Sequence, residues 1–341
     1  MSDVRRWIPW LVAAALVSPL GVGSPTSEAA GKPKAGTKAE KKKQPGRKKG
    51  KKRAGKVASK RTDGAARRVA RAEDKSPRPA LLSILDTVIQ CPPDMVAVAG
   101  RVCVDRFETS LVDAGSGAVW SPYYSPNLER ATQTHLFYED LRSKAQPGTL
   151  QASLPIPSPP TWAPAARARS AKGIVPQGYL SANQADAACK SAGKRLCTEA
   201  EWITACRGEA QRDFPYGESY EQGACNVYRE HHPSALLHQN ASKFHDDPRN
   251  NLVEYEGKPL LRTTGATSRC VSVWGEDAIF DMVGNLDEWV DDKRGVFVGG
   301  FYSRGTRNGC LSRVDAHPRG YSDYSTGARC CADPAASPAP L

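Results

Sequence analysis

A capping box near the middle of the chain is the strongest local folding signal in the sequence. Thr198 is followed three residues later by Glu201. In such a pair the hydroxyl accepts a hydrogen bond from the third helical N–H, and the carboxylate reaches back to the N–H of the cap. The pattern predicts a helix that begins at about Glu199, and Gly208 can end it in a left-handed C-cap.

A second short helix is predicted directly upstream. Small residues recur there at the spacing of one helix face, and a glycine that can stop the helix follows them: Ala185, Ala188, Cys189, Ala192 and Gly193. Cys189 and Cys206 then lie on the inward faces of two consecutive helices, with Cys197 in the turn between them. Because small residues let other backbone pack closely, we expect this stretch in the core.

These residues carry a family resemblance. The segment AGKRLCTEAEW resembles the AGKRLPTEAEW signature of the formylglycine-generating enzyme (sulfatase-modifying factor) family, with Cys197 where that family usually has proline. Three more segments match in the same order: DRFETS at 105–110, DMVGNLDEWVDD at 281–292, and VGGFYS to ARCCAD at the C-terminus. The resemblance implies an irregular, loop-rich, disulfide-braced α+β domain, a variant of the C-type-lectin-like fold.

The start of the chain has the features of a secretory signal peptide, which we assign to residues 1–29. Arg5-Arg6 precedes an apolar run from Trp7 to Val22, and Ser27-Glu28-Ala29 is a small-x-small cleavage site. A membrane anchor is the alternative, but the run is short and contains two prolines. We therefore expect export to the periplasm, the cell surface or the medium, with no transmembrane segment.

A basic segment follows at residues 30–80. Within it, positions 31–79 hold 20 Lys or Arg and 4 Asp or Glu, a net charge of +16. Because the whole chain carries +12, the rest of the chain has a net charge of −4. Such a composition predicts disorder. Residues 31–79 are expected to tether the chain to an anionic envelope or cell-surface polymer, with a solvated spacer as the alternative. Nucleic-acid binding is not favoured, because export removes the chain from intracellular DNA.

The family-like domain is assigned to residues 81–334. Leu81–Ile89 leads in, and Met95–Val98 and Val102–Phe107 are predicted strands around Gly100. A Pro-rich insertion at about 120–171 is expected to be a long irregular loop. Residues 335–341 are expected to be a flexible C-terminus.

Ten cysteines in an exported chain favour disulfides. Cys330 and Cys331 are neighbours in a predicted strand and should point to opposite faces, so they need different partners. The family resemblance implies Cys189–Cys330 and Cys206–Cys310. For the others we favour Cys91–Cys103, Cys197–Cys331 and Cys225–Cys270. A zinc–thiolate site is not favoured, because no CxxC motif occurs.

The resemblance also implies a chemistry. The family's enzyme oxidises a sulfatase cysteine to formylglycine with O₂, using Cu(I) held by two thiolates shortly after a GGS motif. Here Gly299-Gly300 is followed by FYSRGTRNGC, which places Ser303 or Arg304 at the first thiol position. Copper is therefore not expected. The leading hypothesis is a non-catalytic domain that binds a ligand or surface, and the alternative is a divergent oxidoreductase with a non-standard site.

Calcium is the metal that the resemblance favours. The family's GNxWEW turn binds Ca²⁺ through three carbonyls and one carboxylate, which correspond here to Val283, Gly284, Leu286 and Glu288. A second site corresponds to Asn226-Val227. The alternative for Glu288 is a buried acid that caps the turn without metal.

A ligand groove is predicted where the enzyme's active site would lie. Its candidate residues are Ser303, Arg304, Arg307, Arg313 and Arg319. They suggest an anionic or peptide ligand, and ordinary surface arginines are the alternative. The histidines at 231, 232, 238 and 245 are expected to be surface loop residues rather than metal ligands.

Deleting residues 31–79 should leave the melting temperature of the domain unchanged and weaken adsorption to anionic vesicles. Lysine-rich segments gain about 1 kcal/mol per charge near such a surface. Vesicle sedimentation at low and high salt measures the effect. Unchanged, salt-insensitive adsorption of the deletion variant would contradict the tether.

Overall fold

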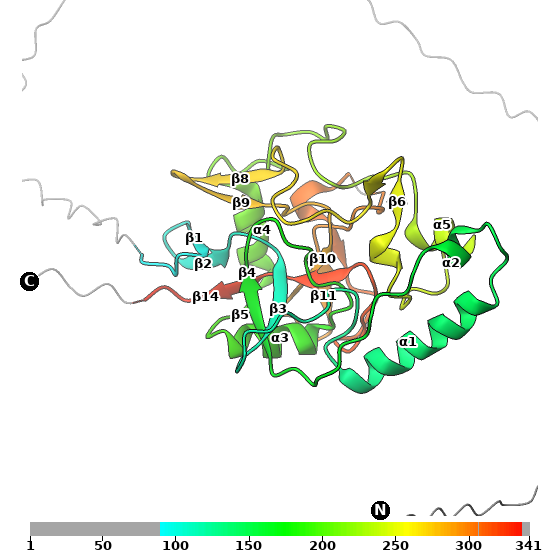
Figure 1. Ribbon diagram of the computed structural model, residues 1–341. Helices are drawn as coiled ribbons and strands as arrows, with labels where there is room; N and C mark the ends of the chain where they lie inside the picture. The colour runs from blue at the N-terminus through cyan, green and yellow to red at the C-terminus, as the bar shows by residue number, and fades with distance from the viewer. Residues whose placement is uncertain (1–88, 306, 336–341) are drawn as a thin grey trace, which may run out of the picture. The chain divides into compact units, whose positions relative to one another are not determined.

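The computed structural model describes residues 89–305 and 307–335 (Figure 1). The chain divides into two units, Met1–Ser76 and Pro77–Leu341, and all described residues belong to the second. The predictions for the signal peptide, the basic segment, most of the lead-in and nearly all of the C-terminal tail fall outside the described residues.

A four-stranded antiparallel sheet joins the two ends of the domain. Its order is β1-β2-β14-β5, so the last strand lies between the first hairpin and the short strand before α4 (Figure 1). The hairpin predicted around Gly100 is confirmed, although its second strand ends two residues earlier than expected. The strands are β1 (Met95–Val98), β2 (Val102–Asp105), β5 (Arg195–Leu196) and β14 (Cys330–Ala332).

A second four-stranded sheet and three two-stranded antiparallel sheets make up the rest of the named strands. The sheet has the order β12-β11-β10-β13, in which β10 and β13 are parallel and the other pairs antiparallel. Its strands are β10 (Asp287–Val290), β11 (Val296–Val298), β12 (Arg313–Val314) and β13 (Thr326–Ala328). The two-stranded sheets pair β3 (Thr109–Asp113) with β4 (Ala166–Ser170), β6 (Glu254–Tyr255) with β7 (Lys258–Pro259), and β8 (Val271–Trp274) with β9 (Asp277–Phe280).

The two predicted helices form as α3 (Ala182–Ser191) and α4 (Glu199–Arg207). In α4 the Thr198 hydroxyl accepts from the N–H of Glu201 at 3.3 Å, and the Glu201 carboxylate accepts from the N–H of Thr198 at 2.8 Å. Helix α3 begins at Ala182, where Ser181 and Gln184 form a second capping box.

The helices bury their small faces as predicted. One core cluster holds Trp202, Cys206 and the valines of β1 and β2, and another packs the alanine face of α3 against Leu196 and Ala328. The remaining helices are α1 (Leu128–Ser143), α2 (Leu150–Ser153), α5 (Pro233–His238) and the 3₁₀ turns η1 (Asn250–Leu252) and η2 (Gly309–Leu311).

The expectation of an irregular loop over residues 120–171 is wrong. This segment contains α1, which has 16 residues and lies at the edge of the domain (Figure 1), as well as α2 and β4. Only Ala131 and Tyr138 of α1 are buried, so its sequence lacks the apolar stripe that marks an amphipathic helix. Asn127 caps it instead. The Pro-rich part, residues 154–165, is irregular as expected.

All five disulfides form as assigned. Three of them close loops of more than 100 residues and attach α3, the turn after β5 and α4 to the C-terminal segment. In the chain-entropy model a loop of this length contributes about 4–5 kcal/mol. Cys330 and Cys331 have different partners, as their alternation along a strand requires. The pairs are Cys91–Cys103, Cys189–Cys330, Cys197–Cys331, Cys206–Cys310 and Cys225–Cys270.

A buried ion pair between Arg329 and Glu288 connects the two sheets. The Nη2 and Nε atoms of Arg329 donate to the two carboxylate oxygens of Glu288 at 2.8 and 3.1 Å. The same guanidinium donates to the carbonyls of Asp105 in β2 and Phe280 in β9, at 2.9 and 2.8 Å. Trp202 of α4 donates its indole N–H to Glu288 at 2.6 Å. Four elements therefore meet at one pair of charges.

Among the described helices, none combines the length and the apolar character that crossing a bilayer requires.

Glu288→Gln should destabilise the domain by about 3–5 kcal/mol, because it leaves the fully buried Arg329 without its counter-charge. Denaturant unfolding measures the loss. Glu221→Gln is the matched control: its ion pair with Arg269 is exposed on both sides, and its removal should change the stability little. Equal losses in the two variants would contradict the central role of Arg329.

Candidate functional site

The turn between β9 and β10 is held in place by Glu108. Its carboxylate accepts from the side-chain amide of Asn285 at 2.6 Å and from the N–H of Leu286 at 3.1 Å. Gly284 and Asn285 both have positive φ, and a Cβ on Gly284 would lie 2.3 Å from the carbonyl oxygen of Asn226. Glycine is therefore required here. The GNLDEW motif is thus part of the architecture of the domain.

Three buried carboxyl groups surround Arg329. Burial, and then the nearby Asp281 and Glu288, raise the pKa of Glu108 well above its usual range. Burial likewise raises the pKa of Asp281 to about 6. Arg329 opposes both shifts, so one guanidinium stabilises several carboxylates at once.

Glu288 does not fit the predicted calcium site. Both of its oxygens already accept hydrogen bonds from Arg329, and one also accepts from Trp202. A divalent cation at this carboxylate would have to displace a buried guanidinium, whose positive charge would repel it. The carbonyls of Val283, Gly284 and Leu286 belong to the same turn and are neutral. They cannot replace the carboxylate that Ca²⁺ prefers.

In the second predicted calcium pair, Asn226 and Val227, one side-chain oxygen could accept a further contact. The side-chain oxygen of Asn226 is buried without a hydrogen-bond partner, while its amide nitrogen donates to Leu260 and Asn285. Val227 is buried in the apolar core. Within residues 89–305 and 307–335, no group of three or more His, Cys, Asp or Glu side chains could hold a metal ion. A single neutral oxygen does not make a calcium site.

An ion pair lies at Arg304, one of the two positions expected for the first catalytic thiol. Arg304 donates to Asp287 at 2.8 Å and lies over the rings of Phe297 and Phe301, at 5.6 and 5.4 Å from their centres. Asp287 is fully buried and stands where the family motif has tryptophan. The sequence shows that Asp287 differs from the family motif, but it does not show that Asp287 pairs with Arg304. Burial raises the pKa of Asp287 to about 7, against the opposing effect of Arg304.

No thiol is available beside this pair. Ser303 turns its hydroxyl to the carbonyl of His231 at 3.2 Å, and Cys310 is bonded to Cys206. A disulfide sulfur cannot act as a thiolate nucleophile or ligand.

Acid–base groups lie close to this ion pair, and the sequence did not indicate that they would meet here. Asp323 accepts from the hydroxyl of Tyr321 at 2.5 Å, and its charge acts on Asp287. His232 is hydrogen-bonded to the hydroxyl of Tyr324 at 2.7 Å, and burial lowers its pKa. His245 lies 4.0 Å from Asp323. Tyr321, Asp323 and Tyr324 are near neighbours in the sequence, but no local spacing connects them to His232 or His245.

We had expected all four histidines to be surface loop residues, and this prediction is wrong for His238. The side chain of His238 is 1% exposed and lies 2.8 Å from Asp247, which also pairs with the buried Arg249. The short helix α5 carries His238 inward, and this buried pairing is the physical reason for the difference. His231 is partly buried, with its ring against Tyr255.

The four predicted groove arginines have separate partners. Arg313 pairs with Glu199 and Asp315 at 2.8 and 2.6 Å. Arg319 contacts Asn183 and Asp291 and donates to the carbonyl of Asp292. Arg307 instead lies over the ring of Tyr228 at 5.7 Å and, among the described residues, makes no ion pair. Three of the four, Arg304 included, are therefore already neutralised by carboxylates.

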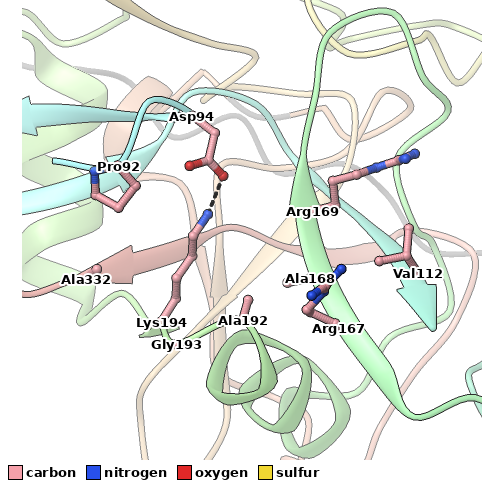
Figure 2. Close-up of a pocket in the computed structure, with 10 residues that line it drawn as sticks. All are labelled: Pro92, Asp94, Val112, Arg167, Ala168, Arg169, Ala192, Gly193, Lys194 and Ala332. Atoms are coloured by element: carbon pink, nitrogen blue, oxygen red, sulfur yellow. Dashed lines mark hydrogen bonds and ion pairs between the residues drawn. The ribbon is translucent and has the colours of Figure 1, made fainter. Parts of the chain in front are cut away.

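A cavity of about 360 Å³ lies elsewhere, between β4 and the end of α3. Figure 2 shows Lys194 and Asp94 pointing toward each other on one side of it, with Arg167 and Arg169 on the strand opposite. Lys194 donates to Asp94 at 2.5 Å and to the buried Asp105 at 2.6 Å. In the sequence, only its place in the AGKRL motif distinguished Lys194. Its charge is compensated within the cavity.

Comparison with known proteins identifies the family. The model of the sulfatase-modifying factor enzyme 1-like domain matches residues 158–329. The formylglycine-generating enzyme of Bos taurus is 29% identical in an alignment of 166 positions that covers 42% of this chain and 43% of that enzyme. The chain thus matches less than half the length of this relative.

Solved structures give weaker likenesses. The Major Tropism Determinant I1 variant has a TM-score of 0.37 and 10% identity, covering 72% of this chain and 54% of that one. CarF has a TM-score of 0.34 and 12% identity, covering 68% and 86%. PvdO from Pseudomonas aeruginosa has a TM-score of 0.32 and 16% identity, covering 68% and 80%. These scores are too low to support an argument about function.

The family match spans half of the chain, and the described domain has the irregular, disulfide-braced α+β architecture that its motifs imply. The chain belongs to the sulfatase-modifying factor enzyme 1-like domain family.

Proposed function

We propose that this chain is an exported, non-catalytic member of the family that acts by binding a ligand or surface. The observation that carries the proposal is that the two candidates for the family's first thiol position are Ser303, whose hydroxyl bonds to a backbone carbonyl, and Arg304, which pairs with Asp287. A cationic side chain there can neither attack as a nucleophile nor ligate Cu(I), which requires soft thiolates. The one cysteine of the segment, Cys310, is held in a disulfide.

Export is supported by the oxidation state of the chain. All ten cysteines lie in the described residues and all are paired. Disulfides in this number form and persist in oxidising compartments. The basic segment at 31–79 is the proposed tether to an anionic envelope or cell-surface polymer, and the folded domain is the proposed ligand-binding part.

The absence of oxidase activity can be tested directly. Incubated with copper, O₂, a reductant and a Cys-x-Pro-x-Arg sulfatase peptide, the protein should produce no aldehyde. Ser303→Cys and Arg304→Cys should also be inactive, because each supplies only one of the two thiols. Mass spectrometry of the peptide is the readout, with the Bos taurus enzyme as positive control and a protein-free reaction as blank. Aldehyde formation by the wild-type protein would overturn the proposal and favour a divergent oxidoreductase.

The Arg304–Asp287 pair is proposed to be structural, which predicts a pH dependence. The pKa of Asp287 is about 7 in the folded state, above its unfolded value of about 3.9. The native state therefore binds the extra proton, and the contribution of Asp287 to stability is lost as the pH rises from about 4 through 7. Arg304→Met removes the opposing charge, so its destabilisation should be larger at pH 8 than at pH 5.

Thermal unfolding at the two pH values measures this difference. Arg294→Met is the control, because the side chain of Arg294 is 77% exposed and makes only a loose pair with Asp292. Its effect should be small at both pH values. A loss in Arg304→Met that is equal at pH 5 and pH 8 would argue against the coupling with Asp287.

A further inference from the structure

A cavity of about 410 Å³ lies beside the loop that follows the Cys225 disulfide. Its walls come from residues 222–231, from the β6–β7 hairpin and from Arg262. It shares no lining residue with the cavity of Figure 2. It borders the predicted groove, because Ser303 bonds to the carbonyl of His231 and Arg307 lies over Tyr228.

Two half-buried arginines line this cavity without a matching acid. Within the described part of the chain, neither Arg229 nor Arg262 has a carboxylate within ion-pair distance, whereas Arg304, Arg313 and Arg329 all do. The guanidinium of Arg262 has a neutral partner, the hydroxyl of Thr267 at 3.2 Å. Burial, and then the charge of Arg229, lower the pKa of Arg262. Two like charges are thus held together in a partly desolvated hollow, an arrangement that favours an added anion.

Among the described residues, the acids nearest the cavity form no ion pair with either arginine. Glu230 and Glu256 line the cavity, and both are exposed. Asp281 acts on Arg262 electrostatically but is bonded to the N–H of Gly265 and buried. The two glutamates balance the two arginines in formal charge, but both guanidinium groups remain without an ion-pair partner among the described residues.

An aromatic wall stands next to the arginines. The rings of His231 and Tyr255 are 3.5 Å apart between centres and inclined by 32°. Tyr228 adds a third ring, with Arg307 over it. Ligand sites combine flat apolar surfaces with a few fixed polar groups in this way.

The cavity is also rigidly supported. The Cys225–Cys270 disulfide fixes one end of its wall, and Asn226 is bridged to Gly284 in the buried turn. The N–H of Arg229 donates to the carbonyl of Tyr302 at 2.9 Å. A wall that is fixed before binding reduces the ordering cost of binding.

We propose that this cavity binds the oxyanion group of a small ligand through Arg229 and Arg262, with the rest of the ligand lying against His231 and Tyr255. Carboxylate, phosphate and sulfate share the required chemistry, since each accepts bidentate hydrogen bonds from guanidinium. The inference deepens the binding function proposed above and rests on it for its biological role. It places the anion beside Arg229 and Arg262, outside the four arginines predicted from the sequence.

Calorimetric titration of the full chain tests the site with inorganic phosphate, sulfate, glucuronate and uncharged glucose at constant ionic strength. Residues 31–79 also attract anions, so the readout is the difference between wild type and variant. Arg229→Gln and Arg262→Gln should each weaken saturable binding at least about tenfold, the scale of one charge-assisted hydrogen bond. Arg294→Gln is the matched control and should bind as wild type does.

Two further measurements sharpen the result. Tyr255→Ala should weaken glucuronate more than phosphate, which distinguishes a ring-bearing ligand from a free inorganic anion. In buffer of low anion content, Arg229→Gln should melt no lower than wild type, because it removes a repulsion rather than a salt bridge.

Equal binding by wild type, Arg229→Gln and Arg262→Gln, or no saturable binding by wild type, would overturn the inference. If binding fails in this way while the peptide assay yields no aldehyde, only this site is ruled out, and the binding function would belong to another surface. Aldehyde formation would instead remove the proposed function itself.

Discussion

The buried pairing of Arg329 with Glu288 is the interaction on which the rest of the domain depends. Both side chains are almost fully removed from water, a transfer that costs several kcal/mol per ion unless every charge is matched. Here the matching groups come from β2, β9, β10 and α4, so the cost is offset only when all four elements are in place. Such a pair favours one arrangement of the sheets over looser alternatives.

The same short segment carries the covalent bracing. Arg329 is followed directly by Cys330 and Cys331, which connect to α3 and to the turn before α4. Strands of two to five residues cannot by themselves hold a domain with so much irregular chain. Long-range disulfides reduce the entropy of the unfolded chain and compensate for the small amount of regular structure. An exported protein can use this solution, because the thiols stay oxidised.

The distribution of arginines separates structural positions from candidate binding positions. Arg304 and Arg329 pair with buried carboxylates, and Arg313 has two acidic neighbours, so their charges serve the fold. Arg229 and Arg262 share a cavity and lack such partners. An anionic ligand gains most where the protein has not already neutralised its own cations. Under the proposed function, Arg304 makes a structural contact near the family's thiol position. The ligand would bind in the neighbouring cavity beside Arg229 and Arg262.

Several features of this protein were determined by the sequence alone. The capping box at Thr198, the small-residue helix before it and the hairpin around Gly100 depend on neighbouring residues, so local patterns predict them. Motif order supplied the family, the fold class and two disulfides, and the strand alternation at Cys330 and Cys331 constrained the others. The lack of a thiol pair after Gly300 was also visible, because it is a matter of residue identity.

Only the tertiary structure decided which distant groups meet. Glu288 was assigned to calcium from its motif, yet its partner Arg329 lies 41 residues away in sequence. Asp287 with Arg304, and Arg229 with Arg262, are brought together by sheet pairing and loop packing that no local spacing encodes. Helix α1 was missed because it buries too few residues to show a helical period. The physical reason is common to all of these cases: burial and charge pairing are properties of the assembled core, and they appear in the sequence only when the partners are close along the chain.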